Sequence, residues 1–186
     1  MIGASLRHGF ANLLRFDGRD PPRLFWPHAL ILLVIACAAW SIVVFAGTPW
    51  IAVTPRTIAV QDAGMRGEAS GAGVPVLPDF AFLIVALGLI AGLYVALVGA
   101  AAVRRLHDAD RRGWWLSVPV ALLAVGLVVM HRMFADFAGA GELPDFDSFA
   151  LIFVNNLVYL VTLAALFVQL VRPGTPGPNR FGPPGA

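Results

Sequence analysis

The residues best suited to chemistry in this chain lie in one short stretch. Residues 104–112 contain four arginines, two aspartates and a histidine, and Gly113, Trp114 and Trp115 follow directly. Arginine binds phosphate and carboxylate groups through paired N–H donors, and tryptophan prefers the headgroup level of a membrane. Long apolar runs flank residues 104–115 on both sides, so we expect a tight loop at a membrane surface. We call residues 104–115 the central motif.

The central motif has a structural and a ligand-binding interpretation. In the structural one, the preceding helix continues, so that Arg104, Asp108 and Arg112 stack at i, i+4 and i+8. Gly113 then ends the helix, because glycine suits the position after a last helical turn. In the ligand-binding one, arginines on one membrane face bind an anionic lipid headgroup or a phosphorylated ligand. The residues predicted for this site are Arg19, Arg104, Arg105, His107, Asp108, Arg111, Arg112 and Arg180.

A catalytic interpretation is weaker, because the histidine and the aspartates are badly placed for it. His107 and Asp108 are adjacent, so on a helix their side chains point about 100° apart and form no ready acid–base pair. A zinc site needs about three or four ligands, and the single cysteine, Cys37, excludes multi-cysteine sites. We therefore predict no catalytic residue, no metal and no cofactor. The net charge of +2 predicts no nucleic-acid partner.

The composition places the chain in a membrane. Hydrophobic residues make up 59% of the sequence and charged residues 13%, whereas about a quarter of a soluble domain is charged. We therefore expect one integral membrane domain of the all-α class over residues 1–186. An apolar helix of about 20 residues crosses a hydrocarbon core of about 30 Å. The four predicted transmembrane helices are at about 27–46, 80–103, 114–130 and 148–171.

Features of the apolar runs predict how the helices begin and end. Pro27 suits the first turn of the first helix, where its missing N–H costs nothing. Trp26, Trp114 and Trp115 are the predicted interfacial anchors. The short third run allows a tilted or partly re-entrant segment as an alternative to a full span.

Small and polar residues predict packing faces in two of the spans. Gly88, Gly92 and Ala96 form a row at GxxxG spacing, which lets another helix approach closely. In the fourth span, polar side chains share one face and should turn toward the bundle, where hydrogen-bond partners are available. These residues are Asn155, Tyr159, Thr162 and Gln169.

The segments outside the spans differ in character. Residues 1–26 form a basic segment that we place in the membrane interface. Residues 47–79 form a long loop rich in Gly and Pro, with candidate short strands at 50–53 and 57–60. Residues 172–186 form a Pro/Gly-rich tail that cannot be helical and should be extended. The spacing of Leu6, Phe10, Leu13 and Leu14 predicts an amphipathic helix in the first segment, and a frayed basic N-terminus is the alternative.

The arginines predict the orientation in the membrane. All 13 basic residues are arginine, and only Arg56, Arg66 and Arg132 lie outside the N-terminal segment, the central motif and the tail. Cytoplasmic loops of membrane proteins carry the excess of positive charge. We therefore predict that both termini and the central motif are cytoplasmic.

Three motifs together resemble a known family. The first is Phe16-x-Gly18-Arg19 with Phe25-Trp26. The second is the central motif, and the third is the run from Pro173 to Pro183. In these motifs the chain is similar to the bacterial integral membrane family DUF805, over nearly its whole length. The resemblance implies a bacterial inner-membrane protein, and it implies no reaction.

From these observations we expect a multi-pass inner-membrane protein that is not an enzyme. Its role would be structural or in protein interaction, through a basic cytoplasmic surface. One alternative is a protein that binds anionic lipid or a phosphorylated ligand. Another is a small transporter or channel subunit that acts as an oligomer. The predicted partners are membrane lipids, anionic ones among them, and either further copies of the chain or another membrane protein.

Overall fold

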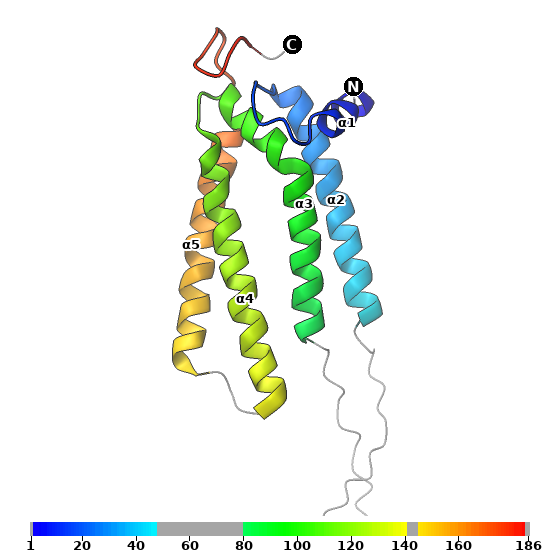
Figure 1. The fold of residues 1–186 in the computed structure, drawn as a ribbon, viewed down its shortest axis with the longest axis vertical. Helices are drawn as coiled ribbons and strands as arrows, with labels where there is room; N and C mark the ends of the chain where they lie inside the picture. The colour runs from blue at the N-terminus through cyan, green and yellow to red at the C-terminus, as the bar shows by residue number, and fades with distance from the viewer. Residues whose placement is uncertain (1, 48–79, 141–144, 185–186) are drawn as a thin grey trace, which may run out of the picture.

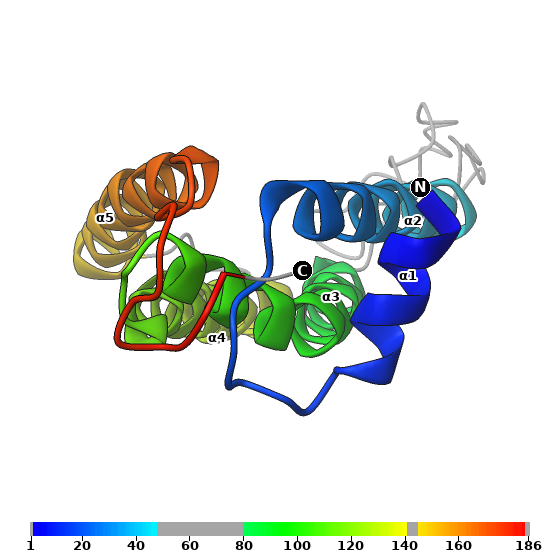
Figure 2. The same ribbon diagram turned by 90° about the horizontal axis from the view of Figure 1, so that it is seen from above.

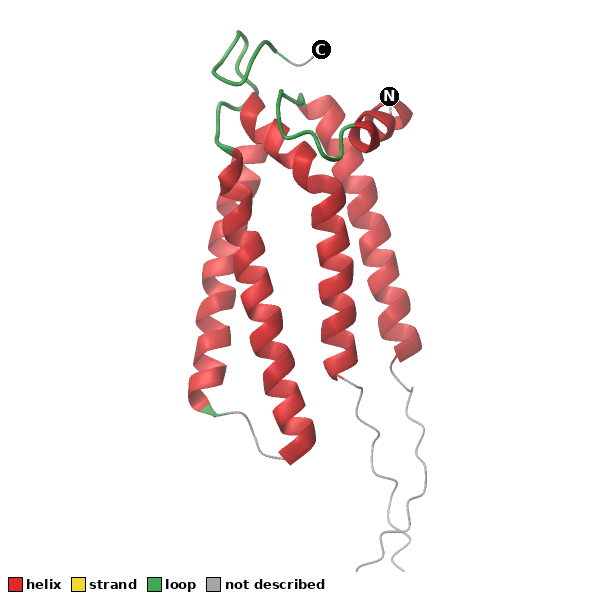
Figure 3. Ribbon diagram, viewed as in Figure 1, coloured by secondary structure: helices red, strands yellow, loops and turns green. Residues whose placement is uncertain are grey.

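The computed structural model describes residues 2–47, 80–140 and 145–184, and helices dominate these ranges (Figure 3). The helices are α1 (Ile2–Ala11), α2 (Pro22–Gly47), α3 (Phe80–Asp108), the 3-10 helix η1 (Gly113–Leu116), α4 (Ser117–Ala140) and α5 (Phe146–Val171). Four of the described segments are long and apolar enough to cross a membrane. Three of them are α2, α3 and α5, and the fourth consists of η1 followed by α4. Within the described ranges, the predicted all-helical class with four such helices is confirmed. The candidate strands at 50–53 and 57–60 lie outside the described residues.

The four long helices stand side by side in two pairs, α2 with α3 and α4 with α5 (Figure 1). Viewed from above, α1 lies across one end of the bundle, against α2 and α3 (Figure 2). Both ends of the chain lie at this same end of the bundle (Figure 1). We call it the terminal face, and it consists of α1 with residues 12–21, 109–112 and 172–184.

Helix α1 is the predicted N-terminal helix, but it is shorter than the apolar pattern suggested. It ends at Ala11, and Leu14 is 88% exposed, so Leu13 and Leu14 do not continue its apolar face. Its close approach to α2 depends on Gly9, because a Cβ at this position would lie 2.3 Å from Nδ1 of His28.

The first membrane helix begins earlier than predicted. Pro22 occupies the first turn of α2, and Pro27 lies inside the helix. The prediction for Pro27 was wrong because Pro22 meets the same requirement for a first-turn proline nearer to the N-terminus. At the other end of the bundle, α5 begins at Phe146, where Asp145 accepts a hydrogen bond of 3.1 Å from the Ser148 N–H as an N-cap.

The third span is one continuous helix, longer than predicted. Helix α4 continues to Ala140, well past the predicted end at residue 130, through His131 and Arg132. At 1.5 Å per residue its 24 residues extend over about 36 Å, enough to cross a bilayer. The helix continues because Phe134 has an apolar partner: its ring stacks on Phe80 at 4.8 Å, at the start of α3.

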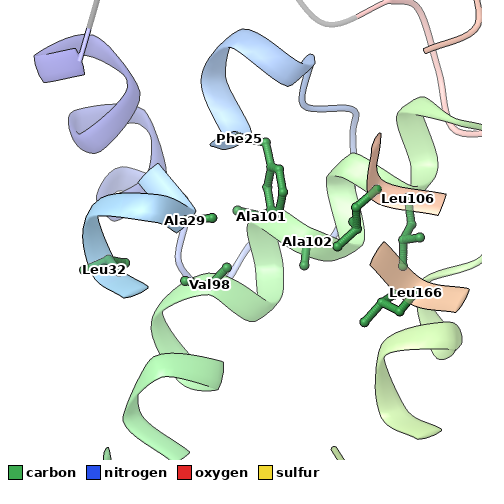
Figure 4. Packing of buried hydrophobic residues seen from close by; sticks show 9 residues of the cluster. Phe25, Ala29, Leu32, Val98, Ala101, Ala102, Leu106 and Leu166 are labelled. Atoms are coloured by element: carbon green, nitrogen blue, oxygen red, sulfur yellow. The ribbon is translucent and has the colours of Figure 1, made fainter. Parts of the chain in front are cut away.

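The core lies in the half of the bundle nearest the terminal face. Alanines of α3 let the first turns of α2 approach closely, and α5 closes the other side (Figure 4). The core therefore joins the two helix pairs directly beneath the central motif. Its members are Phe25, Ala29, Leu32, Val98, Ala101, Ala102, Leu106, Leu166 and Leu170.

The predicted packing faces have different outcomes. Of the small-residue row, only the Gly88 end meets a neighbouring helix, with Leu127 3.6 Å from a Cβ built there. Gly92 and Ala96 are exposed, and within the described residues no atom lies within 4 Å of a Cβ at Gly92. The polar face of α5 does turn inward, and buried Asn155 donates a 3.1 Å hydrogen bond to the carbonyl of Leu122 on α4.

Candidate functional site

The central motif begins as the last turns of α3 rather than as a loop. The helix continues through Asp108, and the surfaces of Arg104, Arg105 and Asp108 are 4%, 0% and 4% exposed. Beyond the helix, Asp110 has a φ of 55°, a left-handed conformation that aspartate tolerates. This residue turns the chain toward η1. The charged residues in the last turns of α3 point into the terminal face.

Gly113 has a different role from the predicted helix cap. It begins η1, and α3 has already ended at Asp108. A Cβ at Gly113 would lie 2.6 Å from Cγ1 of Val103. Glycine is therefore required because the returning chain passes directly against α3.

Asp108 is the centre of a buried ion-pair network. Its Oδ1 accepts hydrogen bonds from Nε and Nη2 of Arg19 at 3.1 and 3.0 Å. Its Oδ2 accepts one from Nη1 of Arg105 at 2.6 Å. The predicted ladder of Arg104, Asp108 and Arg112 is wrong, because the carboxylate turns toward the N-terminal segment and toward the arginine three residues before it.

The C-terminal tail lies directly on Asp108. The carbonyl of Asp108 accepts the Thr175 N–H at 2.9 Å. A Cβ at Gly174 would lie only 2.2 Å from Asp108 Oδ2. The tail therefore reaches the carboxylate only because glycine precedes Thr175.

Arg19 connects the N-terminal segment to both α3 and the tail. Besides Asp108, its guanidinium donates to the carbonyls of Thr175 at 2.7 Å, Gly177 at 2.8 Å and Gly182 at 3.3 Å. Its side chain is 1% exposed. The planar guanidinium has donors in several directions, so one side chain can satisfy all of these acceptors.

A second buried pair joins the N-terminal segment to α3. Nε and Nη2 of Arg104 lie 3.0 and 2.9 Å from Oδ2 of Asp20, and Nη1 donates to the Asn12 carbonyl at 2.7 Å. The other carboxylate oxygen of Asp20 is 3.0 Å from Nε2 of His8 on α1. The Asp20 N–H in turn donates to the Arg104 carbonyl at 3.1 Å. This pair therefore fixes both α1 and the entry to α2.

Arg105 holds the end of α5. Its Nε donates to the carbonyl of Leu170 at 3.0 Å, and its Nη2 donates to the carbonyl of Arg172. The last carbonyls of a helix lack partners within the helix and carry partial negative charge. The arginine satisfies these acceptors while its charge is balanced by Asp108.

The buried charges compensate one another within the terminal face. Three arginines meet the carboxylates of Asp20 and Asp108, and backbone carbonyls of the N-terminal segment, of the tail and of α5 accept further hydrogen bonds from them. Buried charges are tolerated when they are paired and hydrogen-bonded in this way. The network connects four segments that are far apart in the sequence: α1 with residues 12–20, the end of α3, the end of α5, and the tail.

A family model described as a protein of unknown function, DUF805, matches residues 13–183. The chain belongs to DUF805. The matched range contains both buried carboxylates and all three of the arginines that pair with them. No curated protein and no solved structure matches the chain.

In this DUF805 protein the tail is held in place by aromatic and polar contacts. The ring of His107 stacks on Phe181 at 3.8 Å with an angle of 7° between the ring planes, and its Nδ1 is 3.3 Å from the Gly18 carbonyl. Arg180 pairs with Asp110 at 3.1 Å and lies 4.8 Å over the Phe181 ring. Asp110 and Arg180 are about half exposed, so this pair forms the rim of the network.

The predicted ligand-binding residues therefore divide into two groups. Arg19, Arg104, Arg105 and Asp108 are buried and bonded within the protein, and His107 is stacked against the tail. Arg111 and Arg112 are exposed, and in the described part of the chain their side chains make no hydrogen bond or ion pair. Within that same part, no group of three His, Cys, Asp or Glu side chains could hold a metal ion.

The predicted tryptophan anchors lie in two different environments. Trp114 is 53% exposed and stacks on Trp115 at 4.9 Å, so this pair is available to a membrane interface. Trp26 instead packs edge-on against Phe25 and Phe167, at 5.1 and 5.8 Å. Trp26 thus connects the beginning of α2 to α5.

Sequence reasoning missed three residues of this region: Asp20, Gly174 and Thr175. They belong to segments that were predicted only as a basic interfacial segment and an extended tail. A signal was present, because a buried arginine needs a carboxylate and Asp20 is one of few in the N-terminal segment. The identity of each arginine's partner still required the fold.

Proposed function

We propose that this protein is a multi-pass protein of the bacterial inner membrane that acts without catalysis, as a structural or interaction protein. The observation that carries the proposal is the buried network around Asp108. It uses the charged groups of the three motifs to hold segments together, and a densely hydrogen-bonded polar network favours one well-defined arrangement. The network therefore gives an ordered terminal face, and exposed arginines lie on its outer surface.

In this proposal the terminal face lies in the cytoplasm, with both chain ends. Its exposed arginines support this side, because the cytoplasmic side of a membrane protein carries the positive excess. They are Arg7, Arg15, Arg111, Arg112, Arg172 and Arg180, and exposed Arg23 lies next to this face in the first turn of α2.

Photo-crosslinking in native membranes tests the interaction role. A photoreactive residue replaces Arg112 on the terminal face, and a matched one replaces Leu151 on the exposed side of α5. We expect a discrete protein adduct from the Arg112 position, either a second copy or another membrane protein, and lipid adducts alone from Leu151. The adduct should disappear when Asp108→Asn loosens the terminal face. Identical lipid-only patterns at both positions contradict the proposal.

A second candidate function is the binding of anionic lipid or a phosphorylated ligand. The observation that favours it is the pair Arg111 and Arg172, which line the same hollow. Neither side chain makes a hydrogen bond or ion pair to any residue that the structure describes. Guanidinium groups without a carboxylate are available to phosphate. Liposome flotation at increasing anionic lipid content tests this function, and binding that does not depend on lipid charge contradicts it.

A further inference from the structure

We infer that the hollow between η1 and the C-terminal end of α5 binds the headgroup of an anionic phospholipid that carries a free hydroxyl, such as phosphatidylglycerol. This inference deepens the second candidate function and rests on it. The hollow has a volume of about 410 Å³. Its polar lining is Arg111, Gln169 and Arg172, and its apolar lining is Trp115, Ala164, Ala165 and Val168.

The hollow lies at the right depth for a headgroup. Arg172 directly follows the end of α5, and Arg111 belongs to the turn between α3 and η1. Ala164 and Ala165 precede Arg172 by eight and seven residues, which is about 10–12 Å along a helix. The polar groups are therefore at the membrane surface, while the apolar wall extends to the level of the acyl chains. A phospholipid matches this arrangement, with its charged headgroup at the membrane surface and its acyl chains deeper.

The charge of the hollow favours a single phosphate. Arg111 and Arg172 contribute two positive charges, and the lining contains no carboxylate. This differs from the buried arginines of the network, which are balanced by Asp20 and Asp108. Paired guanidinium donors suit the oxygens of one phosphodiester.

Gln169 favours a headgroup with a hydroxyl. It is 8% exposed, and its Oε1 has no hydrogen-bond donor among the described residues. A buried carbonyl oxygen needs a donor, and a phosphodiester supplies only acceptors. A glycerol hydroxyl next to the phosphate supplies the donor that Gln169 lacks.

A larger apolar cleft on α5 does not share these properties. It has a volume of about 720 Å³ and lies between α2, α3, α4 and α5. Its lining contains no cationic residue, so it offers nothing to a phosphate. We therefore place the headgroup in the smaller hollow. It contains Arg111 and Arg172, and the Oε1 of Gln169 there has no donor among the described residues.

Native mass spectrometry of the full chain, released from membranes that contain phosphatidylglycerol and phosphatidylethanolamine in equal amounts, tests the inference. The wild-type protein should retain phosphatidylglycerol in preference to phosphatidylethanolamine. The double variant Arg111→Gln, Arg172→Gln should lose about tenfold in retention, because charge-assisted hydrogen bonds of this kind dominate headgroup binding. Ala165→Trp should have the same effect without a change of charge, because it fills the hollow.

Two comparisons separate the site from general surface charge. The control Arg7→Gln, Arg112→Gln removes two exposed arginines outside the hollow and should change retention less than about twofold. Gln169→Leu should abolish the preference for phosphatidylglycerol over phosphatidylmethanol, an anionic phosphodiester lipid without a headgroup hydroxyl, when membranes contain these two lipids in equal amounts. An equal loss in the control variant overturns this site but leaves lipid binding by the surface intact. No preference for anionic lipid in the wild type overturns both.

Discussion

Gly174 and Asp108 lie so close together that a single methyl group at Gly174 would reach within 2.2 Å of the carboxylate oxygen Oδ2. The same carboxylate pairs with Arg19 and Arg105. The tail can therefore pack against Asp108 only because the residue at position 174 has no side chain. It explains why a segment with no regular secondary structure can be held firmly against a membrane bundle.

Gly174→Ala tests this relationship. The added Cβ must displace either the tail or the carboxylate, and we expect a loss of about 1–3 kcal/mol in the free energy of unfolding in detergent. The matched control is Gly177→Ala, because no atom that the structure describes lies within 4 Å of a Cβ at Gly177. Hydrogen exchange should also speed up in the tail of the Gly174 variant. Equal exchange rates in the two variants contradict the close approach.

Asp108→Asn tests the energetic weight of the network. Loss of the carboxylate leaves Arg19 and Arg105 buried without their shared counter-charge, and breaking such a pair costs about 3–5 kcal/mol. The control is Asp110→Asn, which breaks the half-exposed pair with Arg180 and should cost about 0–1 kcal/mol. Denaturation of both variants in the same detergent measures the difference. Similar stability of the two would mean that the buried pairs contribute no more than a surface pair.

Gly9→Ala tests the packing of α1 against α2. The Cβ would lie 2.3 Å from the ring of buried His28, so α1 must move away from α2. We expect a loss of about 1–3 kcal/mol and faster proteolysis of the N-terminal segment. Gly3→Ala is the control, since no described atom lies within 4 Å of a Cβ there and alanine favours a helix. Unchanged proteolysis of both variants would show that α1 is not packed in this way.

Asp145 predicts a pH effect at the opposite end of the bundle. Hydrogen bonding to Ser148, first to its side chain and then to its N–H, lowers the pKa of Asp145 below its ordinary value of 3.8. The stabilisation is therefore complete above about pH 4 and is lost as the pH falls through the lowered pKa. Asp145→Asn keeps a good N-cap that does not titrate. The melting temperature of the wild type should fall more steeply than that of the variant below pH 4, and parallel curves contradict the assignment.

The ends of the membrane helices show where sequence reasoning reaches its limit. The four apolar runs predicted four helices, because a span must satisfy its backbone internally over about 20 residues. The ends depended on contacts that hydropathy does not contain. Helix α4 continues past residue 130 because Phe134 stacks on Phe80, and α2 begins early because Pro22 is available for its first turn.

The sequence by itself determined that this is a multi-span membrane protein with its charged motifs gathered outside the apolar runs. Those properties follow from composition and from the positions of the arginines along the chain. Only the tertiary structure decided which charges meet. Spacing along a helix favoured Arg104 as the partner of Asp108, yet Arg19 takes that place from 89 residues away. The reason is physical: a buried carboxylate pairs with whichever cation the fold brings within reach, and the tail over Gly174 excludes the water that would otherwise solvate it.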